Sequence, residues 1–201
     1  MSAIEILDVL RARVPDAALN EVSSVDMPAI TADREHILDV MQALRDDPAL
    51  QFALLVDVTA ADYRPATPRF EVVYLLACVG AAYAVGAPAP ARRLRVKVRV
   101  PDEDPRIVSI VSMYPGAEWP EREVFDLFGI LFDGHPDMRR ILMPDEWEGH
   151  PLRKDYPVQI RKDTAAWSPV QISVDEFAEN IRQQRELAAR YAQGPARDRR
   201  D

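Results

Sequence analysis

Residues 93–100 read RLRVKVRV, in which basic and apolar residues alternate without a break. Because successive side chains of a strand point to opposite faces, this period of two predicts a half-buried antiparallel strand. The apolar face would comprise Leu94, Val96, Val98 and Val100, and the basic face Arg93, Arg95, Lys97 and Arg99. Such a basic row is typical of a solvent-facing strand, and the alternative is a partner with an acidic surface. Nucleic acid is a poor match, because the chain carries a net charge of -8.

The residues before this strand predict the remaining elements of one domain. Ser2 and Glu5 have capping-box spacing, followed by an apolar helical face. A second helix is expected to begin after a cap at Thr31 or Asp33 and to run to Arg45. Two short strands on either side of a turn are expected at residues 19–25 and 27–31, and two further strands at the apolar run 52–59 and at residues 69–79. The order is helix, two strands, helix, three strands, which predicts a two-layer α+β domain with a mostly antiparallel sheet.

Composition excludes several classes of protein. The only cysteine, Cys78, can form no internal disulfide and cannot supply the ligands of an iron–sulfur cluster. Residues 72–91 carry no charge over a length that could span a membrane. Gly80, Gly86, Pro88 and Pro90 would break such a helix, so we expect a strand followed by a loop.

Residues 121–157 read EREVFDLFGILFDGHPDMRRILMPDEWEGHPLRKDYP and contain the triplet Gly-His-Pro twice. A short helix is expected between Pro120 and a stop at Gly129, with Arg122 and Asp126 as an i,i+4 ion pair. Beyond Gly129 the chain is dominated by turn-forming residues, which predicts an extended, Gly/Pro-rich segment.

Enzyme chemistry is weakly supported in this segment. His135 and His150 could bind a metal with Asp137 or Asp155, but the ligand spacing typical of zinc sites is missing. Glu121 and Glu123 could act as acid and base, but i and i+2 side chains of a helix point apart. Glu121, Arg122 and Glu123 are better interpreted as a charge network.

A docking surface is the stronger interpretation. Rigid turns would hold Arg139, Arg140, Arg153 and Lys154 in fixed directions, and arginine pairs well with carboxylates. Trp147 and Tyr156 belong to the residue types enriched at interface hot spots. The alternative, a self-contained subdomain braced by salt bridges, is equally compatible with these residues.

The chain is expected to have three parts. Residues 1–105 form the α+β domain, residues 106–157 the short helix and the docking segment, and residues 158–201 a C-terminal tail. The tail has too few apolar residues for a core of its own, apart from a weak helix from Ser173 with Phe177, Ile181 and Leu187. We expect it to extend over partners.

The segments Glu121–Leu142 and Glu148–Pro157, together with PGAEW at Pro115–Trp119, resemble the characteristic block of the C-subunit of respiratory complex I. This is the 30-kilodalton subunit of proton-translocating NADH–quinone oxidoreductase. MPDEW at Met143–Trp147 departs from the stretch common in many members, and the loop at 80–91 looks longer than usual. Neither departure touches the Gly-His-Pro blocks, so only local surface detail is affected.

The resemblance implies a non-catalytic subunit of the peripheral arm, located on the cytoplasmic side of a bacterial plasma membrane and attached only through the complex. FMN, iron–sulfur clusters and quinone would be bound by partner subunits, with no cofactor or metal on this chain. The D-subunit, which holds the quinone site, and the cluster-bearing B-subunit would be its partners. A related complex-I-like, ion-pumping hydrogenase and a stand-alone metal-dependent hydrolase are the alternatives. The side chains expected to meet partners are Glu121, Arg122, Glu123, His135, Asp137, Arg139, Arg140, Trp147, His150, Arg153, Lys154, Asp155 and Tyr156.

Overall fold

The computed structural model divides the chain into two compact units, Met1–Tyr156 and Pro157–Asp201. It describes residues 2–79 and 91–157 of the chain, together with residues 173, 175, 178, 179 and 181–183. The expected loop at 80–90 lies outside the described residues, as does most of the expected tail, including Phe177 and Leu187. In the second unit, residues 175, 178, 179 and 181–183 are helical.

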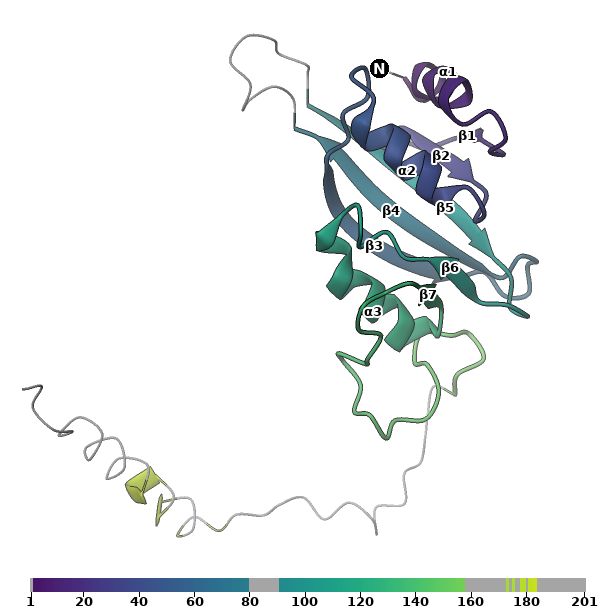
Figure 1. The fold of residues 1–201 in the computed structure, drawn as a ribbon. Helices are drawn as coiled ribbons and strands as arrows, with labels where there is room; N and C mark the ends of the chain where they lie inside the picture. Colours follow the sequence, from purple (N-terminus) through teal and green to yellow (C-terminus); the bar gives the residue numbers. More distant parts are fainter. Residues whose placement is uncertain are drawn as a thin grey trace, which may run out of the picture. The chain divides into compact units, whose positions relative to one another are not determined.

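Up to β5 the first unit has the element order expected from the sequence, and α3 is the expected short helix, whereas β6, η2 and β7 were not expected (Figure 1). Its elements are α1 (Ala3–Arg13), β1 (Asn20–Val22), β2 (Ala29–Ala32), α2 (Ile37–Asp46), β3 (Leu54–Asp62), β4 (Phe70–Cys78), β5 (Arg92–Val100), β6 (Arg106–Val108), the 3-10 helix η2 (Pro115–Ala117), α3 (Glu118–Phe128) and β7 (Leu131–Asp133). The order of helix, two strands, helix and three strands is therefore confirmed, and so is the α+β class.

The main sheet has the strand order β1-β2-β5-β4-β3. The pairs β1–β2, β3–β4 and β4–β5 are antiparallel, whereas β2 and β5 are parallel. The expectation of a mostly antiparallel sheet is confirmed, with this one parallel pair. The alternation in β5 is also confirmed, because its apolar row is buried while Lys97 and Arg99 form ion pairs with Glu71 at 3.0 and 3.3 Å.

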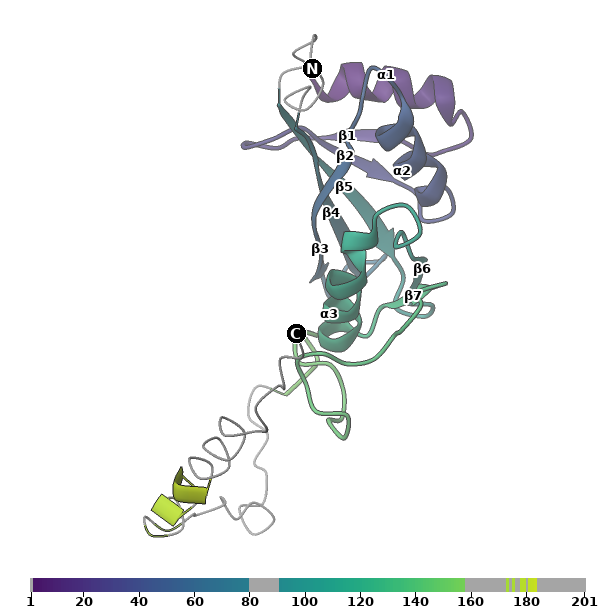
Figure 2. The same cartoon turned by 60° about the vertical axis from the view of Figure 1, so that its left-hand side comes forward.

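Helices α1, α2 and α3 lie on one face of this sheet (Figure 2). The apolar sides of β4 and β5 face them and form the core. The chain after β5 returns to the same core, because Ile107, Ile110 and Phe132 are buried within it. The hydroxyl of Tyr114 donates to the carbonyl of Phe52 at 2.8 Å. The division expected at residue 105 stays a prediction, although buried side chains from both sides of that position pack together.

The helix boundaries depend on local capping. Ser2 and Glu5 form the expected capping box of α1. The expected start of α2 is wrong, because the helix begins at Ile37 and no side chain caps it. Asp33 instead accepts a hydrogen bond from the backbone of Ala18 and pairs with His36. Gly129 ends α3 in the left-handed conformation, as expected.

No helix in the described ranges of the chain combines the length and apolar character needed to cross a bilayer.

Candidate functional site

Helix α3 and the turns that follow it, residues 118–156, carry the two Gly-His-Pro triplets; we call this region the α3 lobe. The second triplet caps the carboxyl end of α3. His150 Nδ1 donates to the carbonyl of Asp126 at 2.9 Å, and the backbone N–H of Leu152 donates to the carbonyl of Leu127 at 3.0 Å. Arg153 donates to the carbonyls of Phe128 and Gly129 at 2.5 and 3.4 Å. Carbonyls that a helix end leaves without partners are thus satisfied by one short segment.

Gly129 is required for this cap. Its φ is +72°, and a Cβ at this position would lie 2.5 Å from the His150 ring and 2.6 Å from Arg153. Burial, together with the charges of Arg153 and Arg140, holds the pKa of His150 below its ordinary range. The ring is therefore a neutral donor within the cap.

Asp126 fixes the loop that follows. Its carboxylate is fully buried and accepts from Arg140 at 2.7 Å. It also accepts the three consecutive backbone N–H groups of residues 141–143 at 2.8–3.0 Å. Burial acts to raise the pKa of Asp126, but these N–H donors and Arg140 outweigh it, so the pKa is lowered.

The predicted i,i+4 pair between Arg122 and Asp126 is wrong. Arg122 instead donates to the carbonyls of Arg139 and Arg140 at 3.0 and 3.3 Å, and its guanidinium lies 5.2 Å from the centre of the Trp119 ring. The sequence does contain a signal for the role of Asp126, since an acidic side chain in the last turn of a helix opposes the helix dipole.

Glu121 lies inside the core and belongs to no surface charge network. Its carboxylate accepts from the Ser109 hydroxyl at 2.6 Å and from the backbone N–H of Ile110 at 2.9 Å. Burial raises the pKa of Glu121 to about 7, even though these two hydrogen bonds favour the charged form. The fully buried Tyr74 hydroxyl faces the same region, and burial together with the charge of Glu121 raises its pKa well above the ordinary value. Glu123, two residues along the helix, is exposed, so the expected divergence of the two carboxylates is confirmed.

Arg69 joins the end of the lobe to the sheet. Its guanidinium binds Asp62 at 2.7 Å, Asp155 at 2.7 Å and Asp102 at 3.0 Å, and its side chain is only 7% exposed. Asp62 also accepts the backbone N–H of Lys154 at 2.8 Å. Hydrogen bonding to Arg69, the largest contribution, lowers the pKa of Asp62 well below its ordinary range. The sequence analysis missed this cluster, because its members are up to 93 residues apart, between Asp62 and Asp155.

The first Gly-His-Pro triplet is held at the start of α3. His135 Nε2 lies 3.0 Å from the carbonyl of Glu118, and the backbone N–H of Asp137 donates to its Nδ1 at 3.0 Å. Nδ1 is thereby the acceptor, so the ring proton is on Nε2. Asp137 forms a two-pronged pair with the exposed Arg139 at 2.6 and 2.7 Å, and this pairing lowers the pKa of Asp137.

The predicted site residues therefore fall into two groups. The side chains that brace the lobe, internally or against the rest of the unit, are Glu121, Arg122, His135, Asp137, Arg140, His150, Arg153 and the exposed Asp155. Glu123, Arg139 and Lys154 are exposed, whereas Trp147 and Tyr156 are half-buried. Tyr156 packs against Gly149, where a Cβ would lie 2.9 Å from its ring.

A metal site of the kind considered from the sequence would require the rings of His135 and His150 to lie close together, beside Asp137 or Asp155. Both rings bond to backbone carbonyls at different turns of α3, and both nitrogens of His135 are engaged. Within the described ranges, no three His, Cys, Asp or Glu side chains are grouped so that they could hold a metal ion.

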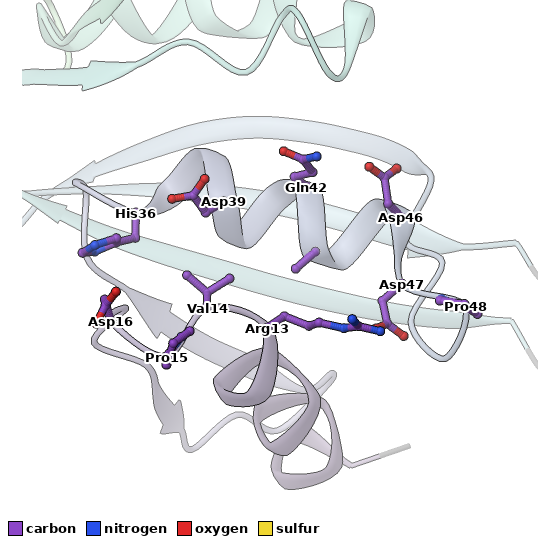
Figure 3. Close-up of a pocket in the computed structure, with 11 residues that line it drawn as sticks. Arg13, Val14, Pro15, Asp16, His36, Asp39, Gln42, Asp46, Asp47 and Pro48 are labelled. Atoms are coloured by element: carbon purple, nitrogen blue, oxygen red, sulfur yellow. The ribbon is translucent and has the colours of Figure 1, made fainter.

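A cavity of about 510 Å³ lies between the end of α1 and α2 (Figure 3). Val14 and Pro15 line its apolar part, and Asp16, Asp39 and Asp46 supply carboxylates. Arg13 crosses it to bind Asp47 at 2.8 Å. The cavity is thus acidic and partly closed by an ion pair of the chain itself.

Comparison with known proteins gives a consistent result. The family model "Respiratory-chain NADH dehydrogenase, 30 Kd subunit" matches residues 30–162. The NADH-quinone oxidoreductase C-subunit of Saccharopolyspora erythraea is 45% identical over 148 residues, which are 72% of this chain and 55% of that protein. The corresponding C-subunit of a Roseiflexus species is 43% identical over 153 residues, covering 76% of this chain and 83% of the relative. The match to the Saccharopolyspora protein therefore spans little more than half of its length.

Two solved structures share the fold. A trypsin-resistant fragment (1–134) of Nqo5 has a TM-score of 0.54 and 31% identity, covering 68% of this chain and 99% of the fragment. A chain of the membrane-bound sulfane sulfur reductase, an archaeal respiratory membrane complex, has a TM-score of 0.61 and 26% identity, covering 77% of this chain and 85% of that one.

These relatives are respiratory-complex proteins, which confirms the resemblance found in the Gly-His-Pro blocks. The chain belongs to the family of the 30 Kd subunit of respiratory-chain NADH dehydrogenase.

Proposed function

We propose that the chain is a structural subunit of the peripheral arm of a bacterial NADH-quinone oxidoreductase. It supports electron transfer from NADH through FMN and iron–sulfur clusters to quinone, coupled to proton translocation, while those groups are bound by other subunits. Family membership supports the assignment to this complex. The observation that carries the structural role is the α3 lobe, in which buried ion pairs and backbone caps hold an exposed surface in place.

The lobe is proposed to meet the D-subunit, which holds the quinone site, with the B-subunit nearby. The side chains that brace the lobe act by positioning, and the exposed ones make the contacts. Trp119 and Leu142 are 63% and 58% exposed, so this surface offers a partner two large apolar side chains. Among the predicted residues, Glu123, Arg139 and Lys154 are exposed and Trp147 and Tyr156 are half-buried, and these are the side chains proposed to make contacts.

No catalytic residue is proposed on this chain. The histidines and the buried carboxylates of the lobe bond to backbone groups or to other side chains of the same unit. The single cysteine is buried at the end of β4. The proposed location is the cytoplasmic side of the bacterial plasma membrane, with attachment only through the other subunits.

The direct test is to tag the chain in its own cells and purify it from membranes in mild detergent. We expect the flavin-bearing and cluster-bearing subunits of an NADH-quinone oxidoreductase to co-purify in equal amounts, with NADH-dependent quinone reduction. Purification of the chain without those subunits would contradict the proposal.

A complex-I-like complex with another electron donor is the second candidate. It is favoured by the likeness to a chain of an archaeal membrane-bound sulfane sulfur reductase. Assays of the purified complex with NADH and with alternative donors, including hydrogen, separate the two candidates.

A further inference from the structure

The loop Leu142–Glu148, which we call the acidic tip, is fixed at both of its ends. At one end the buried Asp126 accepts the N–H groups of residues 141–143. At the other end Arg140, itself bound to Asp126, donates to the carbonyl of Gly149 at 3.1 Å. Within the loop the N–H of Trp147 donates to the carbonyl of Pro144 at 3.0 Å. The conformation of the tip is therefore set before any partner binds, which lowers the entropy cost of binding.

This fixed loop leaves an apolar side chain in solvent. Leu142 is 58% exposed although its own N–H is bound to Asp126. Leu152, in the segment that caps α3, is 49% exposed. Both backbones are held by hydrogen bonds, so neither side chain can be buried by a small loop movement. An apolar side chain held in this way is a natural anchor for a protein interface.

The charges around Leu142 indicate what kind of partner fits. Asp145, Glu146 and Glu148 are all exposed, and none forms an ion pair with a described residue. Four other acidic side chains of the lobe do form ion pairs, namely Asp126, Asp133, Asp137 and Asp155. The lobe contains ten acidic and five basic residues, and Arg122, Arg140 and Arg153 donate to acceptors inside it. The surface charge of the tip is therefore negative.

We propose that the acidic tip docks onto a basic surface of a partner subunit, with Leu142 in an apolar recess and the three tip carboxylates facing lysine or arginine side chains. This rests on the proposed function, because the partner is a subunit of the same complex. The negative charge disfavours an anionic membrane surface or a nucleic acid as the occupant. Charge complementarity of this kind fixes register and accelerates association.

The test compares the tagged wild-type complex with a tip variant, Asp145→Lys/Glu146→Lys/Glu148→Lys. The matched control is Asp16→Lys/Glu21→Lys/Asp39→Lys, which reverses three exposed carboxylates outside the lobe. For the tip variant we expect the cluster-bearing subunits retained per tagged chain to fall at least about tenfold, as like charges meet across the interface. The control should retain them like wild type, and Leu142→Ser should also weaken retention.

A zero-length carboxyl-to-amine cross-linker gives a second measurement on the wild-type complex. Cross-links from Asp145, Glu146 or Glu148 to a lysine of a partner subunit support the proposal. Cross-links confined to lysines of this chain or of a second copy of it overturn it.

The outcomes separate this inference from the proposed function. If wild type retains its partners and the tip variant retains them equally well, the tip is not the contact, although the structural role stands. If wild type retains no cluster-bearing subunit, both proposals fail. Because the tip carboxylates form no ion pair with a described residue, and only the charge of Asp145 acts on the exposed Arg139, the tip variant should unfold thermally within a few degrees of wild type.

Discussion

Replacing Glu121 by glutamine should make the isolated chain more stable at pH 8 than wild type. Glutamine keeps the shape of the side chain, and its amide can accept from the Ile110 N–H and donate to the Ser109 hydroxyl. What it removes is the negative charge, which the fully buried site holds at a cost. Burial accounts for that cost, since it raises the pKa of Glu121 from 4.5 to about 7.

The size of the effect follows from linkage. One pKa unit corresponds to roughly 1.4 kcal/mol, so the full difference between the folded and unfolded chain corresponds to about 3 kcal/mol. Between the two pKa values the folded chain holds the proton on Glu121 and the unfolded chain does not. The contribution of Glu121 to the free energy of unfolding is therefore fully present below pH 4.5, and it is lost as the pH rises through about 7.

Urea unfolding of wild type and Glu121→Gln at pH 5, 6, 7 and 8 measures this directly. The stability of the variant relative to wild type should increase steadily with pH and approach the full value at pH 8. Glu123→Gln, on the exposed side of the same helix, should show no such trend. A difference between Glu121→Gln and wild type that stays constant from pH 5 to 8 would refute the reasoning.

The remaining predictions concern the braces of the α3 lobe, and each is measured by urea unfolding of the full chain. Gly129→Ala should lower the free energy of unfolding by at least about 2 kcal/mol, because the new Cβ would clash with the His150 ring and the backbone has a positive φ. Gly134→Ala, where the φ is also positive but no atom lies within 4 Å of the new Cβ, should lower it by only about 1 kcal/mol. A smaller loss for Gly129→Ala than for Gly134→Ala would contradict the capping role of His150. Asp126→Asn should lower the free energy of unfolding by about 3–5 kcal/mol, because it leaves Arg140 and the N–H groups of the loop without their anion. Protease should then cut this variant first within residues 141–148. Unchanged resistance to protease there would contradict the role of Asp126 in fixing the loop. Arg69→Met should lower the free energy of unfolding by a similar amount, about 3–5 kcal/mol, since the fully buried Asp62 side chain loses its cation. This loss of stability should become smaller at low pH, where Asp62 becomes protonated in the variant. A loss of stability that does not depend on pH would contradict an ionic role for Arg69.

Local patterns in the sequence were sufficient for the order of the elements from α1 to β5 and for α3, but not for β6, η2 and β7. The alternation at residues 93–100 predicts β5 and its buried row, and the turn chemistry at Gly129 predicts the end of α3. These features depend on a few neighbouring residues, because side-chain period and backbone conformation are local properties. The predicted start of α2 was wrong for the same reason. The side chain of Asp33 accepts a hydrogen bond from the backbone of Ala18, and a local pattern does not reveal a contact between residues this far apart in the sequence.

The identity of the lobe residues was also visible in the sequence, but their roles were not. The basic pairs at 139–140 and 153–154 were interpreted as part of a charged docking surface. The structure directs Arg140 to Asp126 and Arg153 to the carbonyls that end α3. Leu142 and the carboxylates of the tip, which the sequence analysis did not single out, are left exposed.

The sequence by itself determined the α+β class, the alternating central strand and the family to which the Gly-His-Pro blocks belong. Only the tertiary structure decided the parallel pairing of β2 with β5, the burial of Glu121 and the joining of Arg69 to Asp155. These features depend on which distant segments meet, and a charged side chain in a sequence does not show whether its partner will be water, a residue far along the chain or another subunit. The same turns that hold the lobe together by internal ion pairs thereby leave it with an acidic outer surface.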